Sequence, residues 1–364
     1  MKIVSLLLFL LFLTSTVITI FAVETADMHP VDSSELTAED KATKFLSSVV
    51  GLDLTEYALV MPTPPPGRDP ESWAEIVAGA EARRREARYP PELCGIIKDE
   101  WSSLRFAANG SNISVMSNCL NGLLSIINVY NLGGDYIYSE PPATPLLNQA
   151  KTILQRYQTY VTEVDAADSS YLVPMQNILN SVDDLSPTNV TIGNVNFQVS
   201  KSEGRTRVQW IYTENNITMN YKRVELEFRY NAFESFQDGW RFYKVSGLSA
   251  LTLEEAYKLA LDTAQNCEFR WVNDEVNEVL SLPDLSDARY DVYFAMVPYR
   301  NDTSHTSNKL SRDPLTLYPY WRFCFYFKDG AIGCFSGVRV SLWGDTEEII
   351  SCEGQLVRRY PNWG

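Results

Sequence analysis

The chain has 364 residues, 45% of them hydrophobic, including 20 Tyr, 16 Phe and 8 Trp. This content is enough to bury a sizeable core and argues against global disorder. Acidic residues number 46 and basic residues 31, so the net charge is −15. A charge of this sign repels nucleic acid and anionic lipid at long range, and we therefore expect no nucleic-acid partner. We interpret the acidity mainly as a solvated surface.

The N-terminal segment predicts export. Lys2 precedes an uncharged apolar run over residues 3–23, and the first charge after it is Glu24. A basic start, an apolar run and small residues near its end are typical of a signal peptide, although a run of this length could also span a bilayer as an uncleaved anchor. We expect residues 1–23 to be a signal peptide or membrane anchor, and to be the chain's only contact with the membrane. The rest is expected to be extracellular or at the cell surface.

The cysteine pattern predicts disulfides. The six cysteines are Cys94, Cys119, Cys267, Cys324, Cys334 and Cys352. No pair has the C-x-x-C spacing of zinc or redox sites, and an even number in an exported chain favours disulfide bonds. Cys94 and Cys119 stand alone in the N-terminal half, and Cys324 and Cys334 flank a predicted turn at 328–330. We therefore expect these two bridges, with Cys267 joined to Cys352.

Catalytic and metal-binding signatures are scarce. The chain has only two histidines, His29 and His305, which nearly excludes a Ser-His-Asp triad, an H-E-x-x-H site or a multi-histidine metal cluster. No phosphate-binding glycine loop, nucleophile elbow or EF-hand is present. We expect no cofactor and no metal. A pair of carboxylates, all that a glycosidase needs, stays open because 46 acidic residues offer many pairs.

Five N-x-[ST] sequons agree with export. They begin at Asn109, Asn112, Asn189, Asn216 and Asn301. Each falls at a predicted turn or strand end, where a bulky glycan could be carried.

The first half of the chain predicts helices and short strands. Thr37 with Asp40 predicts a capped helix that stops at Gly51, and a proline-rich link follows at 61–67. A second helix is expected over 70–88, then strands over 104–108, 113–117, 123–130 and 136–139. Apolar residues at helical spacing predict two further helices, over 146–161 and 171–182.

After Pro187 the spacing of apolar residues changes from about 3.6 to 2, which is typical of an antiparallel sheet with one face exposed to solvent. Residues 224–230 alternate strictly, and another strand is expected over 240–245. Thr252 and Glu255 form a capping box at the start of a helix, followed by strands over 290–299, 318–327, 334–343 and 348–352. We predict an α+β fold with helices packed on antiparallel sheets in two disulfide-stapled domains, 27–183 and 188–364.

The strand over 318–327 is dense in aromatic residues. Seven of its ten residues are Tyr, Trp or Phe, on both faces of the strand. The plain interpretation is a central strand that is covered on both sides. The alternative is a groove for a glycan or peptide, lined by Tyr318, Tyr320 and Trp321.

Two sequence segments resemble segments of a known family. Residues 251–260 read L-T-L-E-E-A-Y-K-L-A, and 343–350 read W-G-D-T-E-E-I-I. This C-terminal half resembles PepSY-like domains, which open with such a helix and close with such a turn and strand; Glu347 stands where their turn carries a glycine. The resemblance implies a helix packed across an antiparallel sheet, in a non-catalytic extracellular module associated with peptidase propeptides and inhibition.

We therefore expect a non-enzymatic binding module of the cell envelope or extracellular space, with a peptide, a peptidase or a surface glycan as partner. Two alternatives stay open, a carboxylate-based hydrolase of surface polysaccharide and a structural surface protein. A cleft with two carboxyl groups roughly 5 to 9 Å apart would favour the hydrolase.

Overall fold

The computed structural model describes residues 36–60, 97–247, 250–267, 269–273, 276–280, 283–299, 312–328 and 335–356. The predictions for residues 1–23, the helix 70–88, Cys94, Cys334 and Asn301 fall outside these ranges. Contacts divide the chain into residues 1–36 and 37–364, and every described helix and strand belongs to the second unit. Among the helices that the structure describes, none is both long and apolar enough to cross a membrane.

Antiparallel sheet is the most abundant secondary structure among the described residues. The larger sheet has nine strands in the order β1-β2-β3-β4-β9-β8-β7-β6-β5. The strands are β1 (Ala58–Leu59), β2 (Asp99–Ala108), β3 (Ser111–Leu120), β4 (Leu123–Gly134), β5 (Thr188–Ile192), β6 (Val195–Ser202), β7 (Arg205–Glu214), β8 (Ile217–Arg229) and β9 (Ala232–Asp238).

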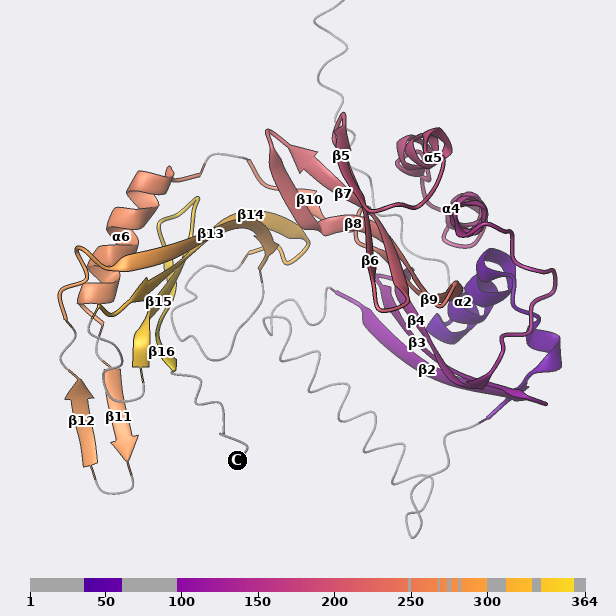
Figure 1. Ribbon diagram of the computed structural model, residues 1–364, viewed down its shortest axis with the longest axis horizontal. Helices are drawn as coiled ribbons and strands as arrows, with labels where there is room; N and C mark the ends of the chain where they lie inside the picture. Colours follow the sequence, from indigo (N-terminus) through magenta and orange to yellow (C-terminus); the bar gives the residue numbers. More distant parts are fainter. Residues whose placement is uncertain are drawn as a thin grey trace, which may run out of the picture. The chain divides into compact units, whose positions relative to one another are not determined.

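Helices pack on one face of this sheet (Figure 1). They are α2 (Ala38–Lys44), which continues as the π-helix η1 (Phe45–Val50), then the short 3-10 helix η2 (Leu54–Glu56), α4 (Leu146–Glu163) and α5 (Leu172–Ser181). The predicted capping box of Thr37 and Asp40 is confirmed, and Gly51 ends the helix at φ 85°, a left-handed conformation that glycine adopts without steric cost. Aromatic side chains fill the core between these layers.

The larger sheet crosses the expected domain boundary. Strands β2 to β4 precede residues 183–188 and strands β5 to β9 follow them, yet β4 pairs directly with β9. The change of period at Pro187 therefore marks the step from helices to strands and does not separate two sheets. The expected strand over 136–139 is reduced to an isolated bridge between Leu52 and Tyr138.

The second sheet contains five strands. They are β10 (Lys244–Val245), β13 (Arg289–Pro298), β14 (Thr316–Tyr326), β15 (Phe335–Trp343) and β16 (Ile349–Leu356). Strand β14 pairs antiparallel with β13 and β15, and its first residues pair in parallel with β10. The expected strand over 240–245 shrinks to β10, because residues 240–242 form a turn in which the Trp240 N–H donates to Asp238. Strands β11 (Phe269–Asn273) and β12 (Val276–Leu280) form a separate hairpin.

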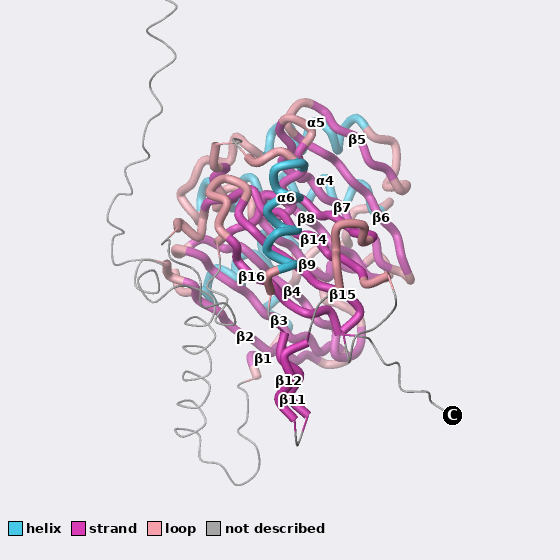
Figure 2. Tube along the Cα trace, turned by 90° about the vertical axis from the view of Figure 1, so that its left-hand side faces the viewer, coloured by secondary structure: helices cyan, strands magenta, loops and turns pink. Residues whose placement is uncertain are grey.

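Helix α6 (Leu253–Gln265) packs on one face of the second sheet (Figure 2). Its predicted capping box is confirmed, since the Thr252 hydroxyl accepts from the Glu255 N–H and the Glu255 carboxylate accepts from the Thr252 N–H. Between β15 and β16, Glu347 has φ 61°, the left-handed backbone that glycine favours. The turn glycine of PepSY-like domains would therefore suit this position.

The cysteines only partly follow the expected pairing. Cys267 and Cys352 form a disulfide that links the end of α6 to β16, as expected. Cys119 and Cys324 carry free thiols, which corrects the two other pairings. Cys324 lies opposite Arg339 in the β14–β15 register, so the hairpin is not centred on 328–330 as the expected bridge to Cys334 required. Cys119 is buried in β3, and burial raises the pKa of its thiol to about 12.

Strand β14 places its odd-numbered side chains under α6. Phe323 and Phe325 are fully buried against Ala256 and Ala260, whose small side chains let the helix approach the sheet closely. The two rings also lie 6.1 Å and 6.0 Å from the ring of Tyr257. Stability of the second sheet should therefore depend on this face of β14.

We predict that Phe325→Ala lowers the free energy of unfolding by about 3–5 kcal/mol, because it removes a fully buried ring and leaves a cavity under α6. Urea unfolding followed by tryptophan fluorescence measures the change. The matched control is Tyr326→Ala, which truncates an aromatic side chain on the opposite face of the same strand and should cost less than half as much. Equal losses would show that α6 does not hold the sheet through this face.

Candidate functional site

Two clusters of charged side chains could carry function. The first lies inside the larger sheet's core, where Asp165 and Asp238 have fully buried side chains. Arg241 Nη2 lies 2.7 Å from Asp165 Oδ2, and Arg241 Nε lies 3.3 Å from Asp238 Oδ2. Lys41 Nζ lies 3.4 Å from Asp165 Oδ1. The cluster thus balances two carboxylates with two cations.

Tyrosines from the helices complete this cluster. Tyr157 of α4 donates to Asp238 Oδ2 at 2.7 Å, and Tyr171, just before α5, donates to the same oxygen. Burial, with Asp238 adding to it, raises the pKa of both phenols well above the usual value. Both carboxylates are fully buried, and each already has a cation beside it. We therefore interpret the cluster as a structural connection between helices and sheet.

We predict that Arg241→Met destabilises the protein by about 3–5 kcal/mol, because it leaves two buried carboxylates with too little positive charge. The matched control is Arg105→Met on the exposed side of β2, which should change stability by less than about 0.5 kcal/mol. Chemical denaturation at neutral pH measures both. A loss below about 1 kcal/mol for Arg241→Met would contradict a structural role.

The buried tyrosines should also make the folded protein less stable at alkaline pH. Burial raises the pKa of Tyr157, Tyr160 and Tyr171. Unfolded tyrosines lose their protons near pH 10. Above that pH the folded state binds more protons than the unfolded state, so stability falls as pH rises, by about 1.4 kcal/mol per pH unit for each such tyrosine. Lys222, whose pKa is lowered by burial, acts in the opposite direction.

The urea concentration at the midpoint of unfolding, measured between pH 8 and 11, should fall as the pH rises above about 10. Tyr157→Phe should make the slope above pH 10 shallower, whatever it does to stability at pH 8, because the variant lacks one buried phenol. Exposed Tyr130→Phe serves as the control and should leave the slope unchanged. A slope that is the same in all three proteins would contradict this account.

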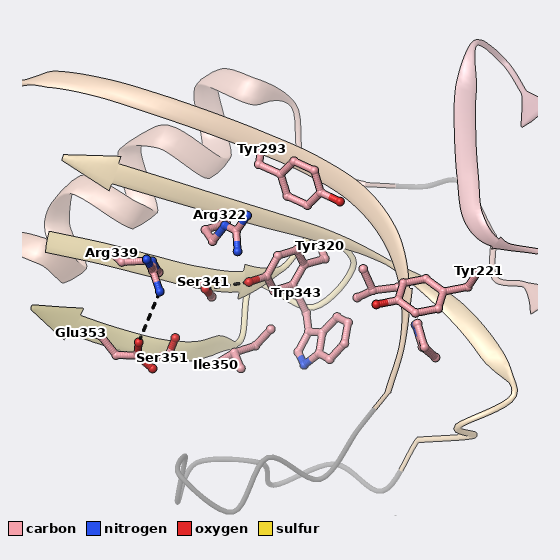
Figure 3. Close-up of a pocket in the computed structure, with 12 residues that line it drawn as sticks. Tyr221, Tyr293, Tyr320, Arg322, Arg339, Ser341, Trp343, Ile350, Ser351 and Glu353 are labelled. Atoms are coloured by element: carbon pink, nitrogen blue, oxygen red, sulfur yellow. Dashed lines mark hydrogen bonds and ion pairs between the residues drawn. The ribbon is translucent and has the colours of Figure 1, made fainter. Parts of the chain in front are cut away.

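The second cluster lines a pocket on the face of the second sheet opposite α6 (Figure 3). The pocket has a volume of about 480 Å³. Most of its lining comes from strands β13 to β16, with one side chain from β8. The lining residues are Tyr221, Tyr293, Val297, Pro298, Tyr320, Arg322, Arg339, Ser341, Trp343, Ile350, Ser351 and Glu353.

Sheet register brings these residues together from distant parts of the chain. Tyr293 lies opposite Arg322, Arg322 opposite Ser341, and Ser341 opposite Ser351, which forms one row across four strands. In a neighbouring row Arg339 lies opposite Glu353. Side chains of directly opposed residues stand about 5 Å apart on the same face. One ligand group can therefore contact several strands.

The positive charges of the pocket are only partly compensated. The Arg322 guanidinium lies 4.9 Å from the ring centre of Tyr293, and in the part of the chain that the structure describes it has no ion pair. Arg339 Nη1 lies 3.9 Å from Glu353 Oε2, at the outer limit of an ion pair. By contrast, Arg312 holds both oxygens of Asp345 at 3.0 and 3.1 Å. The pocket therefore retains capacity for an anion.

Hydrogen-bonding capacity also remains in the pocket. Tyr320 donates to Ser341 Oγ at 2.8 Å. Trp343 is only 4% exposed, and its indole N–H has no hydrogen-bond partner among the described residues. The Arg339 Nε–H is likewise buried and without a hydrogen bond there. Buried donors without partners are uncommon, and an acceptor on a ligand would satisfy them.

The three residues expected to line a groove end up in different places. Tyr320 lines the pocket. Trp321 points to the opposite face, where its ring centre lies 4.5 Å from that of Phe294. Tyr318 packs beside Trp343 and under Arg312, outside the lining. The expected apolar cover on both faces of β14 is therefore wrong for the Tyr320 side, since Arg322 makes that face polar.

Other expected sites remain predictions. The sequon residues Asn109, Asn112, Asn189 and Asn216 are all exposed, which leaves room for glycans. Within the described ranges, no group of three or more His, Cys, Asp or Glu side chains comes together as a metal site would require.

Comparisons with known proteins add little to this picture. No family model matches the sequence, and no curated protein matches it. Among solved structures, the chain is similar to the Bacillus megaterium YpeB C-terminal domain, with 9% identity and a TM-score of 0.28 over 89% of this chain and 100% of that chain.

Proposed function

We propose that the protein is a non-enzymatic binding protein, exported to the cell surface or beyond, whose second sheet binds the carboxylates of an acidic peptide. The observation that carries the proposal is Arg322, a half-buried cation in the lining of a polar and aromatic pocket without an ion pair among the described residues. The resemblance of residues 251–260 to the opening of PepSY-like domains is consistent with a non-catalytic peptide partner.

The chemistry of the lining favours a peptide over the other expected partners. Guanidinium groups bind carboxylates through two parallel charge-assisted hydrogen bonds, which neutral glycans cannot form. Ser341, Ser351 and the Trp343 N–H offer further polar contacts beside this charge. Tyr293 and Tyr320 add aromatic surface on which apolar parts of a ligand can pack. Arg322 and Arg339 thus fit an acidic side chain that is flanked by apolar atoms.

The same lining supports binding over hydrolysis. A carboxylate-based hydrolase needs two carboxyl groups at the scissile bond. Among the described lining residues only Glu353 is acidic, and it lies beside Arg339. The net charge of −15 repels a long polyanion more strongly than a short acidic peptide. For the peptide, salt screens charges more than about 8 Å away, so that Arg322 and Arg339 in the lining dominate.

Fluorescence anisotropy with a labelled octapeptide of alternating Glu and Val tests the proposal. We expect binding that weakens with salt, and at least tenfold weaker binding of the same peptide with Gln in place of Glu. Arg322→Gln should weaken binding by roughly 10- to 100-fold, the equivalent of a charged hydrogen bond worth about 1.5–3 kcal/mol.

The matched control is Arg105→Gln, which removes the same charge from the exposed side of β2. It should change the affinity by less than twofold. Equal binding of the Glu and Gln peptides, or equal losses from both arginine variants, would contradict the proposal. Mass spectrometry of the incubated peptide provides a second check, because cleavage would contradict a non-enzymatic function.

A further inference from the structure

Strand β13 lies at the border of the second sheet beside the pocket. It pairs with β14 from Arg289↔Tyr326 to Pro298↔Leu317, and no other strand of the described residues pairs with it. Its C-terminal part contributes Met296, which packs with Met219 of β8. Its first five residues are all exposed. Among the strands that the structure describes, this stretch is therefore a sheet edge whose outer side has no partner strand.

The register shows which backbone N–H and C=O groups of β13 point away from β14. The Phe327 N–H donates to Ser336 O at 3.1 Å, and the Gly344 N–H donates to Pro319 O at 2.7 Å. Odd-numbered residues of β14 therefore direct their backbone groups toward β15, and even-numbered residues toward β13. Even-numbered β14 residues oppose odd-numbered β13 residues. The N–H and C=O groups of Tyr290 and Val292 consequently point away from the sheet.

This edge has only part of the usual protection. Natural edges are blunted by proline, by charged side chains such as lysine, by bulges, by inward-pointing charges or by a covering helix or loop. Residues 289–293 contain no Pro or Lys, and the β13–β14 register has no bulge. Its charged side chains, Arg289 and Asp291, stand on the pocket side with Tyr293, where Asp291 accepts from the Tyr326 hydroxyl at 2.7 Å and Arg289 lies 5.8 Å from the same ring. An extended segment can approach the edge without displacing them.

The side chains along the edge specify what would bind there. On the α6 side, Tyr290 and Val292 are 39% and 43% exposed, and Tyr257 lies 4.8 Å from the Tyr290 ring. On the pocket side, Tyr293 is 42% exposed and carries the Arg322 guanidinium over its ring. A strand added to β13 alternates its side chains between these two sides. Apolar residues would meet Tyr290 and Val292, and the acidic residue opposite Tyr293 would meet Arg322.

We propose that the acidic peptide binds by strand addition to residues 289–293 of β13, with alternating apolar and acidic side chains on the two faces. The inference rests on the proposed function and adds the binding mode. Main-chain hydrogen bonds to Tyr290 and Val292 supply affinity independent of sequence, and Arg322 selects the acidic positions, which is how added strands are generally recognised.

Backbone methylation of the probe tests this mode directly. In an antiparallel addition, the peptide residues that hydrogen-bond to Val292 place their side chains on the α6 side and are the Val residues. Methylating the Val nitrogens of the Glu-Val octapeptide should weaken binding at least 30-fold, and methylating the Glu nitrogens by less than threefold. A larger loss from methylating the Glu nitrogens than the Val nitrogens would indicate parallel addition to the same edge. Equal losses of affinity from the two methylated peptides would overturn the proposal.

A variant of the protein provides the second test. Val292→Pro removes the outward N–H and leaves the hydrogen bonds between β13 and β14 in place, and proline is tolerated on edge strands. It should weaken binding at least tenfold, whereas Val292→Thr, which keeps the N–H and the branched shape, should bind within threefold of the native protein. Thermal unfolding checks that both variants are folded.

The outcomes separate this inference from the proposed function. If Arg322→Gln weakens binding but neither methylation nor Val292→Pro discriminates, the pocket binds the acidic peptide and strand addition is wrong. If the unmodified peptide does not bind, both are wrong. If sedimentation shows a dimer that Val292→Pro dissociates and no peptide binds, the edge belongs to a second copy of this chain, which also overturns the peptide as occupant.

Discussion

The ion cluster around Arg241 is the constraint on which the larger half of the structure depends. Its members come from α2, from the segment after α4, from the last residue of β9 and from the turn that follows, and Lys41 and Asp165 are separated by 124 residues. Buried charges are tolerated only when each has a partner at close range. The two carboxylates are therefore satisfied only when α2, the end of α4 and β9 occupy their native positions together. We infer that the cluster fixes how the helices lie on the sheet, while the surrounding aromatic core provides most of the stabilisation.

The sequence predicted those helices and strands whose signals lie within a short stretch of chain. The capping boxes at Thr37 and Thr252 and the helical apolar stripes gave helices that the structure contains. Strand β9 was missed because its buried residues Phe233 and Phe236 are three apart, which breaks the period of two. A bulge explains this spacing, since the register shifts between Phe228↔Phe233 and Glu227↔Ser235. The Arg241 cluster left no local signal, because its charges meet only after folding.

The pocket shows the same limit of sequence reasoning. Aromatic density drew attention to Tyr320, which does line the pocket, but Arg322, Arg339 and Ser351 were not predicted. One signal was present in the sequence: Arg322 is the only charged residue between positions 316 and 326, and it shares the parity of Tyr320. Its neighbours on β13, β15 and β16 could not be found in this way. Which residues oppose it depends on hairpin register, and the β14–β15 hairpin is centred beyond the turn that the sequence suggested.

Along β14, odd-numbered and even-numbered residues divide the packed face of the sheet from the face that lines the pocket. Odd-numbered side chains such as Phe323 and Phe325 pack under α6, whereas Tyr320 and Arg322 face the pocket. The same division passes to β13, because directly opposed residues share a face: Tyr293 belongs to the pocket side and Val292 to the α6 side. Substitutions at even positions of β14 can therefore alter the pocket lining with little effect on the core. If the pocket binds a ligand as proposed, this arrangement would let ligand preference change while the sheet that presents the pocket stays intact.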